Sequence, residues 1–186
     1  AEIKEKVLIK INKENLNPEE VESIAEAVAV GAIKYSILKQ GIGKDIIFDF
    51  EKSLSLEGDS GPYLQYAYTR ALSVVNKARG INQEGTSNLD MGSLESKSDK
   101  LPISVQALLS LLCQLPEIME RSYQDLAPQH IVTYLLEVAS AFNRFYAENK
   151  IIGSENEAYY LTLTQATSIV LKNGLRILAI PTLERM

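Results

Sequence analysis

The sequence is poor in the residues from which most catalytic and metal sites are built. Its 186 residues include one cysteine, one histidine and no tryptophan. The single Cys113 allows no internal disulfide, which fits a reducing compartment, and we expect it to be a small buried apolar side chain. A Ser-His-Asp triad could use only His130, and a zinc site would need carboxylates. We therefore expect no catalytic residue and no metal site.

Long apolar runs and an excess of basic charge are also missing. No run approaches the roughly 20 residues that cross a bilayer, and no signal-peptide pattern opens the chain, so we expect a cytoplasmic protein without membrane contact. Nineteen Lys and Arg against 24 Asp and Glu give a net charge of -5. A nucleic-acid site would therefore have to be local. The apolar content of 46% is that of a folded domain.

Helix signals recur along the chain and predict an all-α protein. Asn17-Pro18-Glu19-Glu20, for example, combines a cap, a first-turn proline and two acids at a helix start. Residues 45–50 fit no regular pattern, and we expect an irregular buried segment there. Polar, Gly and Ser residues from Gly80 to Lys100 predict a mobile loop. The result is a helical bundle of about six helices with one long mobile loop. The predicted helices are 18–40, 61–79, 101–114, 116–121, 128–149 and 158–178.

The helix predicted at 61–79 has two faces. Its apolar residues share one arc that should face the core: Leu64, Ala67, Tyr68, Ala71, Val75 and Ala78. A separate arc carries Tyr63, Tyr66, Arg70 and Lys77, and no acidic residue lies between Pro62 and Gly80. Spacing alone favours the edge of the core for such tyrosines and a solvated face for the cations. The same stripe also suits stacked bases and phosphates.

The segment around this helix resembles a known family. Phe48-Asp49-Phe50 and the run Leu-Ser-Leu-Glu-Gly-Asp-Ser-Gly-Pro-Tyr-Leu-Gln-Tyr-Ala-Tyr-Thr-Arg over residues 54–70 resemble arginyl-tRNA synthetases, where the catalytic domain meets the anticodon-binding domain. Further segments fit the same family over nearly the full chain: 29–35, 134–135, 142–146, 170–178 and 184–186.

The resemblance implies the domain organisation and the partners. Residues 1–60 would form a helical junction from the end of the catalytic domain, and 61–186 an α-helical tRNA anticodon-binding domain. Nothing resembles the His-Ile-Gly-His and Lys-Met-Ser-Lys signatures that handle ATP, so we expect a C-terminal fragment that holds no cofactor and is inactive alone. The parent would use ATP with Mg to ligate arginine to tRNA. The expected partners are the anticodon stem-loop of the arginine tRNA and the remainder of the synthetase.

The resemblance also implies a binding site. In the family, residues matching Tyr63, Tyr66, Arg70, Tyr146 and Met186 line a pocket for the middle anticodon base, a cytosine. Lys77, Lys172 and Arg176 are candidate phosphate contacts, with a solvated face charge favoured for Lys77. The chain departs from the family at residues 158–161, which read Ala-Tyr-Tyr-Leu where an arginine is common. The loop 80–100 follows no family pattern.

Two other functions compete with this interpretation. The first is a stand-alone helical protein-interaction module without RNA binding, and an RNA-binding measurement separates the two. The second is a small enzyme with a carboxylate metal site in the bundle core. That site would need Glu-x-x-His pairs on facing helices, and His130 has no glutamate three residues before it.

Overall fold

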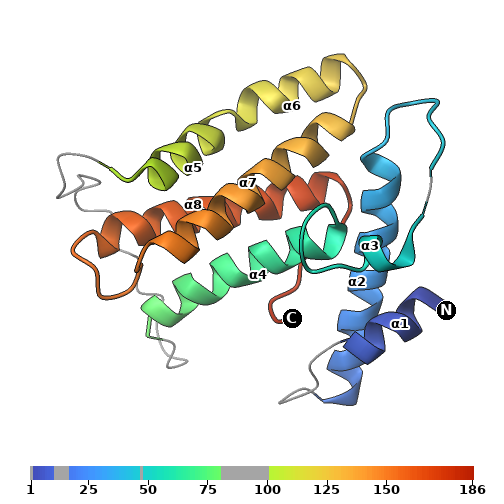
Figure 1. Ribbon diagram of the computed structural model, residues 1–186, viewed down its shortest axis with the longest axis horizontal. Coiled ribbons are helices and arrows are strands. Elements are labelled where there is room, and N and C mark those ends of the chain that lie inside the picture. Colours follow the sequence, from blue (N-terminus) through green and yellow to red (C-terminus); the bar gives the residue numbers. More distant parts are fainter. Residues whose placement is uncertain (1, 11–16, 47, 81–100) are drawn as a thin grey trace.

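The computed structural model describes residues 2–10, 17–46, 48–80 and 101–186 (Figure 1). Over these ranges the chain forms helices and no strand, which confirms the predicted all-α class. Apart from Gly80, the loop predicted at 80–100 lies outside the described residues. The helices are α1 (Glu2–Lys10), α2 (Pro18–Leu38), α3 (Phe50–Ser53), α4 (Gly61–Ala78), α5 (Ile103–Cys113), α6 (Leu115–Gln124), α7 (Gln129–Glu148) and α8 (Glu157–Ile177).

All six predicted helices are present, with ends close to those expected, and α1 and α3 are additional. Helix α1 carries no cap signal, and it forms against α2, where Lys4 Nζ pairs with Glu22 at 2.8 Å and Glu26 at 3.3 Å. Asp49 caps α3 by accepting from the backbone N–H groups of Glu51 and Lys52. Helices α1 and α3 thus depend on contacts that the spacing of apolar residues in the sequence does not reveal.

The segment before α3 is irregular, as predicted, but it is not buried. The Ile46 side chain is 49% exposed, and Phe48 and Phe50 are only partly covered. The two phenylalanine rings pack against each other edge to face, with centroids 5.2 Å apart. Their apolar surface is thus partly covered by the neighbouring ring, so the segment needs no place in the main core.

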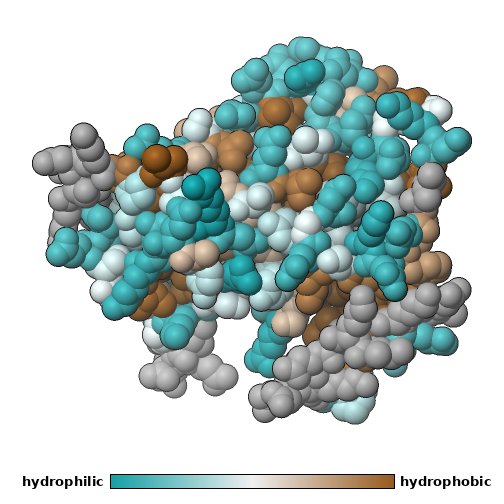
Figure 2. Space-filling model, viewed as in Figure 1, coloured by the Kyte–Doolittle hydropathy of each residue, from teal (hydrophilic) through white to brown (hydrophobic). Residues whose placement is uncertain are grey.

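Helix α7 is the centre of the bundle, because it touches α2, α4, α5, α6 and α8. Helices α4 and α8 pack along one side of it and α5 along another (Figure 1). Tyr134 of α7 donates to the Leu111 carbonyl of α5 at 3.0 Å, and burial raises the pKa of this phenol to about 12. Over α6 the visible surface is mostly hydrophilic (Figure 2). The fully buried side chains at the centre include Leu64, Leu108, Leu135, Val138, Phe142, Leu171 and Leu175.

The predicted core arc of α4 is confirmed. Leu64, Ala67, Tyr68, Ala71 and Val75 are all buried, and Ala78 at the last turn is partly covered.

The expectation for Cys113 is wrong, because this side chain is exposed. It is the last residue of α5. The two residues before it, Leu111 and Leu112, pack against the core, whereas Cys113 does not.

Helices α2 and α4 cross at very short range, through two glycines. A Cβ atom on Gly61 would lie closer to the Gly31 carbonyl oxygen than the sum of the two van der Waals radii, and one on Gly31 would lie 2.8 Å from Gln65 Oε1. The start of α4 is also fixed by Ser60, whose side chain accepts from the Tyr63 N–H at 3.1 Å.

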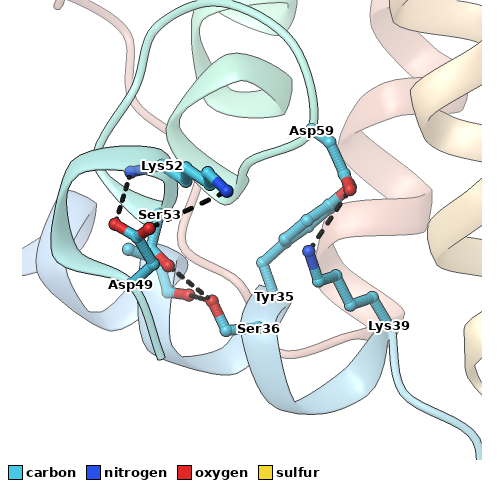
Figure 3. A network of polar contacts seen from close by, with 8 residues as sticks. Tyr35, Ser36, Lys39, Asp49, Lys52, Ser53 and Asp59 are labelled. Atoms are coloured by element: carbon cyan, nitrogen blue, oxygen red, sulfur yellow. Dashed lines mark hydrogen bonds and ion pairs between the residues drawn. The ribbon is translucent and has the colours of Figure 1, made fainter. Parts of the chain in front are cut away.

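The loop that leads into α4 is tied to α2 by polar contacts (Figure 3). Tyr35 donates to Asp59, and Lys39 Nζ lies 3.2 Å from the other carboxylate oxygen of Asp59. Burial, assisted by the neighbouring carboxylate, raises the pKa of Tyr35. Ser36 and Ser53 share a buried hydrogen bond of 3.2 Å. These contacts hold the residues before α4 in place.

Two general features bear on function. None of the helices in the described ranges is long and apolar enough to cross a membrane. Within the same ranges, no three His, Cys, Asp or Glu side chains gather in a way that could hold a metal ion.

We predict that Gly61→Ala lowers the free energy of unfolding by about 1 to 3 kcal/mol, because the added methyl group has no space against the α2 backbone. Helix propensity alone predicts the opposite sign, since alanine favours helices over glycine. Urea unfolding followed by circular dichroism measures the change. Gly41→Ala is the control, because its Cβ would meet only the Lys44 side chain at 3.9 Å. Equal stability of the two variants would contradict the close crossing.

Candidate nucleic-acid interface

The predicted stripe on α4 meets one aromatic residue of α7. Tyr63, Tyr66 and Arg70 are partly buried on α4, and Tyr146 of α7 is 42% exposed beside them. The guanidinium carbon of Arg70 lies 4.5 Å from the Tyr66 ring centroid and 5.3 Å from that of Tyr146. A guanidinium at these distances is attracted to the negative ring faces. The structure thus brings together four of the five residues predicted to line a pocket.

Hydrogen bonds fix this group, and they introduce a residue that the sequence did not single out. Arg70 Nη1 donates to Asn143 Oδ1 at 2.6 Å, and Nη2 donates to the Tyr66 hydroxyl oxygen at 2.9 Å. Asn143 Nδ2 donates in turn to the Tyr63 hydroxyl oxygen at 3.0 Å. The signal for Asn143 was its place three residues before Tyr146, on the same face of α7. We call Tyr63, Tyr66, Arg70, Asn143 and Tyr146 the aromatic-arginine cluster.

The cluster is supported by the core on one side. Phe142 is fully buried, and its ring packs 6.2 Å from that of Tyr146. Tyr63 packs with its ring against the main core while its hydroxyl joins the cluster. The core-edge interpretation and the binding interpretation of Tyr63 are therefore both compatible with its position.

The charge of Arg70 is not neutralised by a carboxylate. Its two hydrogen-bond partners are neutral, and over the described part of the chain Arg70 makes no ion pair. An uncompensated guanidinium flanked by partly exposed rings can stack on a planar group and can attract negative charge. Such a surface suits an unpaired base with its phosphate backbone.

The C-terminal tail runs beside α4 on a different side. Gln65 Nε2 donates to the Pro181 carbonyl at 2.8 Å and to the Ala27 carbonyl of α2 at 3.1 Å. Thr69 Oγ1 donates to the Leu183 carbonyl at 2.8 Å. Met186, the fifth predicted pocket residue, is partly buried and packs against an apolar cluster formed by α1, α2, Leu54 and Leu183.

The three candidate phosphate contacts are exposed. Lys77 lies in the last turn of α4, and Lys172 and Arg176 lie on α8. Among the described residues, none of the three forms a hydrogen bond or ion pair with the aromatic-arginine cluster. Arg176 lines a shallow groove between α6 and α8, together with Leu115, Met119, Asn173 and Ile177.

The departure from the family at residues 158–161 has a structural counterpart. Tyr160 is 6% exposed, and its ring packs edge to face with Phe145 at a centroid distance of 5.4 Å. This position is therefore part of the core between α7 and α8.

Together, these features define a helical module with a surface suited to stacking. The family model described as the DALR anticodon binding domain matches residues 64–186. The chain therefore belongs to the DALR anticodon-binding domain family. This finding favours a tRNA-binding module over the stand-alone interaction module.

Relatives and solved structures agree with this family. The chain is 39% identical to the arginine-tRNA ligase of Thermococcus kodakarensis over 183 residues, which is 96% of this chain and 28% of the relative. It is 38% identical to that of Pyrococcus furiosus over 187 residues, covering 98% and 29%. The structure matches Thermus thermophilus arginyl-tRNA synthetase with a TM-score of 0.81 and 28% identity, over 100% of this chain and 31% of that one. The chain thus spans less than a third of the length of each of these three proteins.

We predict that Thr69→Val loosens the C-terminal tail, because the hydroxyl that holds Leu183 is lost while the side-chain shape is kept. Carboxypeptidase should release Met186 and Arg185 about three- to tenfold faster than from the wild-type chain. This factor is the increase in the population of undocked tail that is expected when one net hydrogen bond is lost. Thr162→Val is the matched control, because its hydroxyl bonds only Ala158 within α8. Release at the wild-type rate would show that Thr69 does not hold the tail.

Proposed function

We propose that this chain binds tRNA through the anticodon stem-loop of an arginine tRNA, and that the aromatic-arginine cluster receives the middle base, a cytosine. The observation that carries the proposal is the position of Arg70 beside the rings of Tyr66 and Tyr146, in a member of an anticodon-binding family. Sequence-specific RNA recognition mostly uses loop bases that splay out and stack on aromatic or guanidinium planes. The cluster offers both kinds of plane on one face.

The energetics favour such a site. Stacking of a base on an aromatic side chain contributes about 1 to 3 kcal/mol, and the partly exposed Tyr146 offers a ring to a ligand. Arg70 already stands among its partners, so little side-chain freedom is lost when RNA binds. Met186 is proposed as a further pocket residue on the family resemblance alone, because its side chain here packs against α1, α2, Leu54 and Leu183.

Phosphate contacts are assigned to Lys77, Lys172 and Arg176. All three are exposed, and the segments that carry them, Pro62 to Gly80 and Tyr159 to Leu183, contain no acidic residue. Local positive charge of this kind compensates for the net charge of -5 of the chain as a whole. These contacts would position the RNA without reading its sequence.

The whole protein is proposed to ligate arginine to tRNA using ATP and Mg. Support comes from the names of the relatives, which are arginine-tRNA ligases. This chain lacks sequences resembling the two ATP-handling signatures, so alone it should not aminoacylate. Residues 1–60, with α1 to α3, are proposed as the junction toward the remainder of the synthetase, and 61–186 as the anticodon-binding domain.

We predict that Tyr66→Ala and Lys77→Ala affect RNA binding in different ways. Tyr66→Ala removes a stacking ring and the acceptor of an Arg70 hydrogen bond, so affinity for a cytosine hairpin should fall about tenfold or more and base discrimination should flatten. Lys77→Ala should weaken all hairpins alike, by a few-fold. Fluorescence-anisotropy titrations measure both, with anticodon hairpins that differ only at the middle base.

The salt concentration must be the same in every titration, because phosphate contacts dominate the affinity. If Tyr66→Ala discriminated between the hairpins as well as the wild-type chain does, the aromatic-arginine cluster would not be the site that binds the middle base. If the wild-type chain bound none of the hairpins, the proposal would fail and the stand-alone interaction module would become the better account.

A further inference from the structure

We propose that Asn143 is a positioning residue that, together with Arg70, sets the hydrogen-bond polarity of the aromatic-arginine cluster: Asn143 leaves Tyr63, and Arg70 leaves Tyr66, with a hydroxyl proton to donate to a bound base. This inference rests on the proposed function, because it describes how the same site would read its ligand. It is carried by the order of donors and acceptors along the hydrogen-bonded chain of four side chains.

The orientation of the Asn143 amide follows from its partner. A guanidinium group has donors only, so the amide atom 2.6 Å from Arg70 Nη1 must be the carbonyl oxygen. The amide NH₂ then faces Tyr63, 3.0 Å from its hydroxyl oxygen. A flipped amide would place its NH₂ against the guanidinium N–H and lose the bond to Arg70. Arg70 therefore fixes the orientation of Asn143.

The same reasoning fixes the two phenols. The Tyr63 oxygen accepts from Asn143, and the Tyr66 oxygen accepts from Arg70 Nη2 at 2.9 Å. Each phenol has one proton of its own, and neither of these bonds uses it. Arg70 and Asn143 thus turn two groups that could donate or accept into donors. Both hydroxyl protons are left for a third group.

A site lined by donors selects a base edge that carries acceptors. Cytosine presents two neighbouring acceptors, N3 and O2, on its Watson-Crick edge. Uracil has the same ring, but its N3 carries a hydrogen. A donor facing N3 therefore bonds cytosine, whereas with uracil two hydrogens would meet, and a polar group left unpaired in this way is strongly disfavoured. The hydrogen-bond donors that Asn143 helps to set are thus proposed to discriminate cytosine from uracil, two bases that stack almost equally well.

Asn143→Asp tests polarity separately from position. The new carboxylate has nearly the shape of the amide and still accepts from Arg70, so Arg70 stays in place. It has no N–H, however, and Tyr63 must then donate its proton to the carboxylate. Tyr63→Phe removes the same proton by a different route, and it keeps the ring that packs on the core.

The experiment compares hairpins with cytosine or uracil at the middle anticodon position, bound to the full 186-residue chain at one salt concentration. The ratio of the two dissociation constants is the measured quantity, because the added negative charge weakens both complexes alike. The ratio should fall about tenfold in Asn143→Asp and in Tyr63→Phe. The double variant should fall no further than either single variant, since both remove the same proton.

Arg144→Gln is the matched control. Arg144 follows Asn143 directly on α7, but it is exposed and pairs with Glu148 at 2.8 Å. Its replacement should leave the cytosine-to-uracil ratio unchanged. Thermal unfolding of all variants by circular dichroism should remain cooperative. If Asn143→Asp does not fold, Tyr63→Phe still tests the proton that Asn143 is proposed to free, and an unchanged ratio in that variant would overturn the inference.

The outcomes distinguish the two proposals. If the wild-type chain prefers cytosine and both single variants keep that preference, Asn143 does not set the polarity and the proposed function stands. Additive losses in the double variant would also overturn the shared-proton account. If the wild-type chain binds neither hairpin or binds both equally, the proposed function itself fails, and this inference fails with it.

Discussion

The close crossing of α2 and α4 is the constraint on which the rest of the structure depends. At this point Gly61 lies against the Gly31 carbonyl, and the Gln65 side chain lies over Gly31. Gln65 in turn holds the Ala27 carbonyl of α2 and the Pro181 carbonyl of the tail. One crossing therefore sets the position of three segments. The direction of α4, and with it the placement of Tyr63, Tyr66 and Arg70, follows from this contact.

Helix α4 combines three roles because its sides meet different surroundings. One side packs into the bundle through residues such as Leu64 and Ala67, and another holds the tail through Gln65 and Thr69. The third side carries the partly buried stripe that meets α7. A rigid, multiply anchored helix is a good carrier for a recognition site, because its side chains are held in place before any ligand arrives.

Much of this arrangement could be predicted from the sequence, and the limits have physical causes. The helical period placed both faces of α4 correctly, because a buried helix must repeat its apolar residues at that period. The bond between Asn143 and Tyr63 joins residues 80 positions apart, and no local pattern encodes it. Expectations from residue type also failed where neighbours decide exposure, as at Cys113 and around Phe48. Met186 was placed in the pocket by resemblance, whereas its packing against α1 and α2 depends on tertiary structure alone.

The docking of the tail has a consequence for the order of folding. Its hydrogen bonds join positions 114 to 145 residues apart: Thr69 with Leu183, Gln65 with Pro181, and Lys34 with Ala179. Closing so long a loop costs entropy before the contacts form, and each acceptor is of use only after α2 and α4 have met. Because these partners lie far apart in the sequence, we expect the tail to dock after α2 and α4 have packed together. During synthesis, the bond between Thr69 and Leu183 could form only once both residues, 114 positions apart, had left the ribosome.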